Sequence, residues 1–145
     1  MGGEKEYKIQ PNYIQSTDKL PTTEELNQRT EYRKHRPIFC FKHLADKDGD
    51  FGIKKIGQIA DFRTLLSKFK MYSELTWGQI EQCSNYHAGE IQWRSMKKNQ
   101  FPENCIDFPP YKFGTSDSFR VFGYHNQGIF FIVWLDPNHK MINMS

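Results

Sequence analysis

The sequence has no long apolar run, few cysteines and no large excess of charge of either sign. None of its apolar stretches approaches the roughly 20 residues that a membrane-spanning helix requires. The opening residues MGGEKEYKIQ also contain no apolar segment of the kind found in secretory signals. We therefore expect a cytoplasmic protein without a membrane partner.

The cysteines are too few and too widely spaced for a metal site. Cys40, Cys83 and Cys105 form no CxxC pair and lie at no zinc-ligand spacing from a histidine. An odd number of cysteines in a cytosolic chain is typical of free thiols. The sequence therefore predicts reduced cysteines, no metal and no cofactor.

The length and charge of the chain limit its organisation and its partners. At 145 residues it fits one domain of ordinary size, and its formal net charge of +3 permits contact with RNA without arguing for it unaided. Residues 1–35 are polar, with two prolines and a cationic end. We predict an N-terminal polar extension over residues 1–35, with a short helix at 23–32 capped by a threonine, and one folded domain over residues 36–145.

The stretch DKDGDFG at residues 46–52 has the alternating aspartates that open a calcium loop. An EF-hand loop needs glycine at its sixth position and glutamate at its twelfth. Counting from Asp46 places Phe51 and Gly57 at those positions, and a strand-like run precedes the stretch where an EF-hand has a helix. The sequence therefore predicts a solvent-exposed turn and no metal site.

Two helices are predicted in the middle of the chain. After Asp61, apolar residues recur at i, i+3, i+4, i+7 and i+10, which is typical of a helix with one buried face. Thr76 and Gln79 form the pattern of a capping box, which predicts a second helix from Thr76. Residues 87–93 follow as a short extended segment.

The end of the chain carries the strongest structural signal. SFRVFGYHNQGIFFIVWLDPNHKMI contains two apolar runs joined by HNQG, which predicts a β-hairpin with positive φ at Asn126 and Gly128. DPNH then predicts a tight turn, and PIFCFKHL at residues 37–44 predicts a buried strand.

Together these elements predict a single α+β domain. An antiparallel sheet of four or five strands would pack on one side against the helix pair within residues 61–83 and would include the C-terminal β-hairpin. The predicted core consists of large apolar side chains from the strand at residues 37–44, the two helices and the second strand of the hairpin: Phe39, Phe41, Leu65, Leu66, Phe69, Trp77, Ile80, Phe130, Ile132 and Trp134.

Four cationic or titratable residues lie around this hairpin: Arg120, His125, His139 and Lys140. Antiparallel pairing across HNQG brings Arg120 and His139 to the same end of the sheet. RNA cleavage at a 2′-hydroxyl needs a base, a cation for the phosphate and an acid, which histidine and arginine can supply. Solvated strand ends and a capped turn explain the same residues, so both interpretations stay open.

His87 and Glu90 form a second group of candidates. Their spacing puts both side chains on one side of a helix but on opposite faces of a strand. We treat them as reserve catalytic residues, with a structural role as the alternative.

The helix pair followed by FRVFGYHNQGIFFIVWLDPNHKM resembles the RelE/ParE toxin superfamily over residues 60–143. The chain also looks like a group of uncharacterised small bacterial proteins that share the patterns H..EI.W and VWLDPNHK, found here at residues 87–93 and 133–140. The first resemblance implies a RelE-like fold and a metal-independent endoribonuclease. Such an enzyme cleaves mRNA, commonly at the ribosome, and is restrained by a cognate antitoxin protein.

In this comparison Arg120 corresponds to the strand arginine of the toxins, and His139 with Lys140 corresponds to their terminal basic pair. Arg120 would then hold the phosphate, His139 would act as acid or base, and Lys140 and His125 would contact RNA. An inactive relative of the toxins is one alternative. The other is a non-enzymatic module that binds a protein partner through the aromatic-rich sheet or the charged N-terminal segment.

Overall fold

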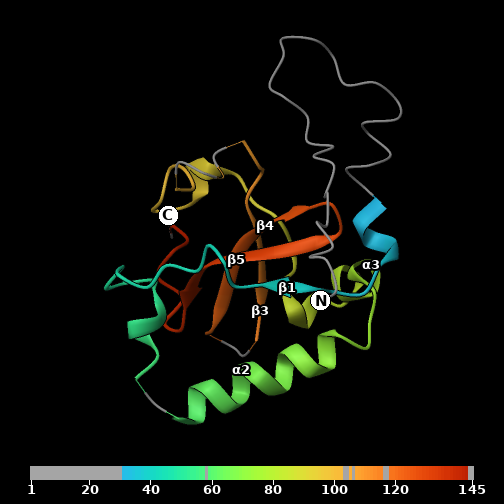
Figure 1. The fold of residues 1–145 in the computed structure, drawn as a ribbon, viewed down its shortest axis with the longest axis horizontal. Helices are drawn as coiled ribbons and strands as arrows, with labels where there is room; N and C mark the ends of the chain where they lie inside the picture. Colours follow the sequence, from blue (N-terminus) through green and yellow to red (C-terminus); the bar gives the residue numbers. More distant parts are fainter. Residues whose placement is uncertain (1–30, 58, 103–104, 106, 116–117, 144–145) are drawn as a thin grey trace, which may run out of the picture.

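The computed structural model describes residues 31–57, 59–102, 105, 107–115 and 118–143. The described chain forms one small α+β domain built on a five-stranded sheet (Figure 1). The short helix predicted over residues 23–32 lies almost wholly outside the described residues. No helix within the described ranges is both long and apolar enough to cross a lipid bilayer.

The five strands form one mixed sheet in the order β1-β5-β4-β3-β2. Their bounds are β1 Phe39–Cys40, β2 Gly89–Glu90, β3 Tyr111–Gly114, β4 Arg120–Asn126 and β5 Ile129–Asp136. The pairs within β2 to β5 are antiparallel, whereas β1 runs parallel to β5. The predicted antiparallel sheet is therefore wrong at its β1 edge, because the chain passes through helices after β1, and such a crossover can deliver a parallel neighbour.

Two α-helices separate β1 from the remaining strands, α2 Ile59–Tyr72 and α3 Trp77–Gln82. In Figure 1, α2 lies below the sheet and α3 lies to its right. The capping box is confirmed, because the Gln79 amide donates to the Thr76 hydroxyl at 3.2 Å and the Thr76 amide donates to Oε1 of Gln79 at 2.9 Å. Short 3-10 helices complete the chain: η1 Tyr32–Lys34, η2 Ile53–Lys55, η3 Ser84–Tyr86 and η4 Trp93–Ser95.

The C-terminal hairpin is confirmed, with two details that the sequence does not predict. The positive φ predicted for Gly128 is confirmed (79°), but the second positive φ falls on Gln127 (53°) and not on Asn126. The register also shifts within the hairpin, since Phe122 pairs with Trp134 while Gly123 pairs with Ile132. This β-bulge allows two consecutive residues of β5 to face the same side of the sheet.

Both faces of the sheet are covered, and each has its own core. The helix-side core lies against α2 and α3: Tyr32, Leu65, Phe69, Tyr72, Trp77, Ile80, Tyr111, Phe113, Phe119, Val121, Phe130, Ile132 and Leu135. The loop-side core is covered mainly by irregular chain: Phe51, Met96, Phe101, Cys105, Phe122, Tyr124, Val133, Trp134 and Met141. This two-sided burial explains why β5 is apolar along nearly its whole length.

Two members of the predicted core are exposed, and a third lies on the other face. Phe41 and Leu66 are each 52% exposed, so their prediction as core residues is wrong. The stripe of α2 that meets the sheet contains Leu65, and Leu66 is turned by about 100° around the helix from it. Phe41 follows the end of β1, where pairing with β5 has stopped. Trp134 belongs to the loop-side core and not to the core beneath the helices.

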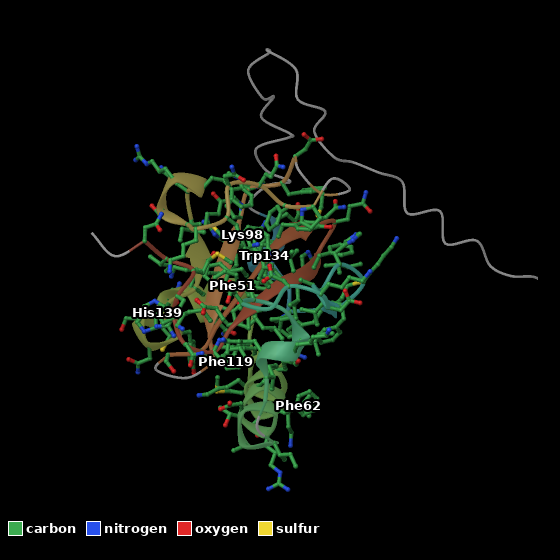
Figure 2. The ribbon with its side chains drawn as sticks, turned by 90° about the vertical axis from the view of Figure 1, so that its left-hand side faces the viewer. Phe51, Phe62, Lys98, Phe119, Trp134 and His139 are labelled. Atoms are coloured by element: carbon green, nitrogen blue, oxygen red, sulfur yellow. The ribbon has the colours of Figure 1, made fainter. Side chains whose placement is uncertain are left out.

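The acidic stretch forms a turn that is anchored to the loop-side core. Oδ1 of Asp48 accepts the backbone N–H groups of Asp50 and Phe51, and its Oδ2 forms a 2.8 Å ion pair with Lys98. The predicted turn is confirmed, but it is not wholly exposed, since Phe51 is only 5% exposed. Figure 2 shows Phe51, Lys98 and Trp134 in the same part of the molecule.

Glu81 of α3 connects the beginning of the described chain to the sheet. Its carboxylate accepts the hydroxyl groups of Tyr32, at 2.7 Å, and Tyr111, at 3.0 Å, and forms a 2.8 Å ion pair with Arg33. The carbonyl of His35 also accepts the amide of Trp77. Residues 32–35 therefore pack as part of the folded domain.

Candidate functional site

Arg120 lies inside the fold, at the end of β4. It is 4% exposed and pairs in register with Gly114 on one side and Asp136 on the other. Nη1 donates to the carbonyl of Phe119 at 3.2 Å and lies 3.0 Å from the point that a Cβ on Gly114 would occupy. The missing side chain of Gly114 thus leaves the space that the guanidinium fills. This position suits a residue that joins strand ends more than one that meets a phosphate in solvent.

Lys112 is a neighbouring cation that the sequence reasoning missed. Its Nζ donates to the carbonyl of His87 at 2.6 Å. Burial, and then the positive charge of Arg120, lower the pKa of Lys112. In the sequence, Lys112 is marked only as the single lysine within the apolar stretch YKFG. This pattern also fits a strand at the edge of a sheet. The structure therefore holds two cationic side chains near each other at this end of the sheet.

The DPNHK motif has a structural explanation in Asp136. This residue is 1% exposed, and its two carboxylate oxygens accept the backbone N–H groups of Lys140, at 2.9 Å, and Met141, at 2.8 Å. The predicted tight turn is confirmed, and His139 within it has a φ of 55°. His139 is half-buried and Lys140 is exposed. The turn follows the end of β5, where Asp136 pairs with Arg120.

The reserve pair, His87 and Glu90, lies at the β2 edge of the sheet. Both residues are exposed. The extended segment predicted over residues 87–93 is confirmed only at β2, to which Glu90 belongs, because His87 has a φ of 52° and Trp93 begins η4. The interaction of His87 with Lys112 uses its backbone carbonyl and not its ring. This contact gives the backbone of His87 a structural role beside Lys112.

His125 is enclosed by aromatic rings. Its imidazole stacks on Tyr32 at a centroid distance of 4.0 Å, and the rings of Trp77 and Tyr111 meet it nearly at right angles, at 4.7 and 4.4 Å. Both ring nitrogens are shielded from solvent and find no hydrogen-bond partner among the described residues. Burial lowers the pKa of His125 to about 3. The RNA contact predicted for His125 is therefore not supported, because a neutral, enclosed imidazole offers no charge to a phosphate.

No protein family, curated protein or solved structure was found to match the chain. Within the described ranges, no group of three or more His, Cys, Asp or Glu side chains is placed to hold a metal ion.

The surface feature that stands out is an apolar face on α2. Ile59, Phe62 and Leu66, at positions i, i+3 and i+7 of one helix, are 73%, 50% and 52% exposed. Phe41 extends this surface toward the sheet edge, since its ring lies 6.1 Å from that of Phe69. We call these four exposed residues, Ile59, Phe62, Leu66 and Phe41, the α2 apolar face. Figure 2 places Phe62 at the lower end of the molecule, well apart from His139.

Two exposed cations border this face. Arg63 follows Ile59 by four residues and Lys70 follows Leu66 by four, so each lies one helical turn from an apolar neighbour. In the part of the chain that the structure describes, the ion pairs are Arg33 with Glu81 and Lys98 with Asp48, and neither involves these two cations. We call Arg63 and Lys70 the basic rim.

Proposed function

We propose that the protein is a non-enzymatic module that binds a protein partner on the α2 apolar face. The observation that carries this proposal is the exposure of Ile59, Phe62 and Leu66 as one continuous stripe on α2. Isolated apolar residues on a surface need no explanation, but large ones grouped beside charged residues are typical of interaction sites.

The energy available at this face fits the centre of an interface. Full burial of one large apolar side chain stabilises by about 1.5 to 3 kcal/mol. The four residues are 50% to 73% exposed. Covering them would therefore contribute about 3 to 7 kcal/mol before the cost of association. A partner must cover surrounding surface as well, with these side chains as the desolvated centre.

Site-specific photo-crosslinking in the protein's own cells tests this proposal. A photoreactive residue in place of Phe62 should capture a discrete protein, whereas the same residue in place of exposed Thr64, on the opposite side of α2, should not. With the captured protein purified, Leu66→Asp should weaken binding at least tenfold and Thr64→Asp less than twofold. Equal capture from both positions, or none from either, would contradict the proposal.

A RelE-like endoribonuclease, or an inactive relative of one, is a second candidate. The observation in its favour is the pair of cations Lys112 and Arg120 at the sheet end that His139 follows, because clustered cations suit a phosphodiester. mRNA, commonly at the ribosome, would then be the substrate, and a cognate antitoxin would be the protein partner.

RNA cleavage by the purified protein in EDTA tests this second candidate. His139→Ala and Lys112→Gln should each lower the rate at least a hundredfold while leaving the circular dichroism spectrum unchanged. Arg120→Ala is less informative, since removing a buried side chain can unfold the protein. Intact mRNA and unimpaired growth on expression of the wild-type chain would exclude an active endoribonuclease.

A further inference from the structure

We infer that the segment held on the α2 apolar face is an amphipathic helix of another protein, with acidic side chains flanking its apolar stripe. This inference rests on the proposed binding function and assigns the chemistry of its partner. Two observations support it: the positive charge beside the α2 apolar face, and the geometry of α2 and β1.

The basic rim sets the charge of the partner. Arg63 and Lys70 are exposed, lie on the same flank of α2 and follow two residues of the apolar stripe by one turn. The one acidic residue of α2, Asp61, is adjacent in sequence to Phe62 and is turned about 160° around the helix from Arg63. Carboxylates on the partner would meet this rim, and such complementary charges at an interface fix its register and speed association.

A second copy of this chain fits the face less well. A two-fold dimer brings the same patch of both copies together. Each basic rim would then meet a surface that is itself apolar and basic, and the like charges of Arg63 and Lys70 would oppose close approach. The charge therefore favours a partner of different composition.

The elements around the face favour a helix over an added strand. Strand addition uses a row of unpaired backbone groups along a sheet edge. The nearby edge strand β1 contains only Phe39 and Cys40, and very short edge strands are poor templates for pairing. In contrast, residues at i, i+3 and i+7 form a ridge about 10 Å long, which a second helix can pack against.

Two synthetic helical peptides provide the probe. Both carry leucines at i, i+3, i+4 and i+7, one with glutamates beside the stripe and one with lysines. We expect the glutamate peptide to bind at least tenfold more tightly in fluorescence anisotropy, and this preference to reverse in the Arg63→Glu/Lys70→Glu variant. Leu66→Ser should weaken the binding of both peptides by a similar factor, and Thr64→Glu, at an exposed position on the opposite side of α2 from Leu66, should change neither affinity by more than twofold.

The remaining outcomes overturn the inference, and they separate it from the binding function on which it rests. Equal affinity for both peptides, with loss of both on Leu66→Ser, would overturn the acidic partner but leave a binding face. Absence of binding by either peptide at 1 mM would overturn the helical partner, and the crosslinking from Phe62 would then decide the binding function alone. If the protein bound vesicles with one quarter anionic lipid more tightly than either peptide, the face would be assigned to a membrane surface. Dimerisation abolished by Leu66→Asp would assign it to a second copy.

Discussion

Replacing His125 with phenylalanine should remove a large part of the pH dependence of stability. In the unfolded chain the imidazole titrates near 6.5, whereas burial lowers its pKa to about 3 in the folded protein. Below pH 6.5 the imidazole is therefore protonated in the unfolded state but stays neutral in the folded state. Stability decreases from there until the pH approaches about 3, where the folded form also takes up the proton.

The expected size of this loss follows from the two pKa values. Between pH 7.5 and pH 5.0, protonation of His125 in the unfolded chain should lower the free energy of unfolding by about 2 kcal/mol. Both ring nitrogens of the imidazole are shielded from solvent beneath the aromatic rings and lack partners among the described residues. His125→Phe removes the titration and these two buried nitrogens, so we expect its stability at pH 7.5 to equal or exceed that of the wild type.

Urea unfolding followed by tryptophan fluorescence is the assay, because Trp77 lies 4.7 Å from the imidazole. His43, whose pKa is lowered by burial and then by the charge of Lys42, also contributes to the pH dependence of stability. Its contribution is the same in wild type and variant, so the difference between their pH dependences isolates His125. His125→Gln is the control, since its amide stays polar but does not titrate. The reasoning would be refuted if the loss of unfolding free energy between pH 7.5 and pH 5.0 were the same in wild type and His125→Phe to within about 0.5 kcal/mol.

Three further substitutions test the packing. A Cβ at position 123 would overlap the carbonyl oxygen of Phe131, so Gly123→Ala should lower the free energy of unfolding in urea by about 3 kcal/mol or more. Gly49→Ala is the control and should change it little, because a Cβ at position 49 meets nothing within 4 Å. Asp136→Asn replaces one acceptor oxygen with an NH₂ group in a buried turn and should cost about 1 to 3 kcal/mol, measured as a lower denaturation midpoint. Thr76→Ala removes the α3 cap and should cost about 1 kcal/mol, with Thr64→Ala, at an exposed site within α2, as the comparison. A destabilisation of Gly49→Ala as large as that of Gly123→Ala, or no effect at Asp136 or Thr76, would contradict the packing described.

Elements that depend on neighbouring residues could be predicted from the sequence. The α3 cap at Thr76 and the 120–136 hairpin rest on side chains a few positions apart, and both are confirmed. The parallel pairing of Phe39 with Phe130 could not be predicted, because it joins two distant segments and involves only two residues of β1. The loop-side core was missed for a similar reason, since irregular segments that cover a sheet have no periodicity.

The candidate site shows where periodicity stops being informative. The spacing of Phe62, Leu65 and Leu66 predicts an apolar side on α2, but which part of that side is covered depends on where the sheet lies against it. The sequence therefore assigned Leu66 to the core instead of to an exposed face. Likewise, DPNHK suggested chemistry around His139, whereas the hydrogen bonds of Asp136 explain much of the motif as a closed turn.

The pairing of an early strand with the last strand also determines when this protein can fold. β5 follows α2, α3, β3 and β4 in the chain, so the helix-side core lacks Phe130, Ile132 and Leu135 until β5 has been synthesised. Loop closure of such length is slow, and the exposed aromatic rings favour aggregation in the meantime. We expect the nascent chain to need protection by chaperones, and its native sheet to form in a late, cooperative step.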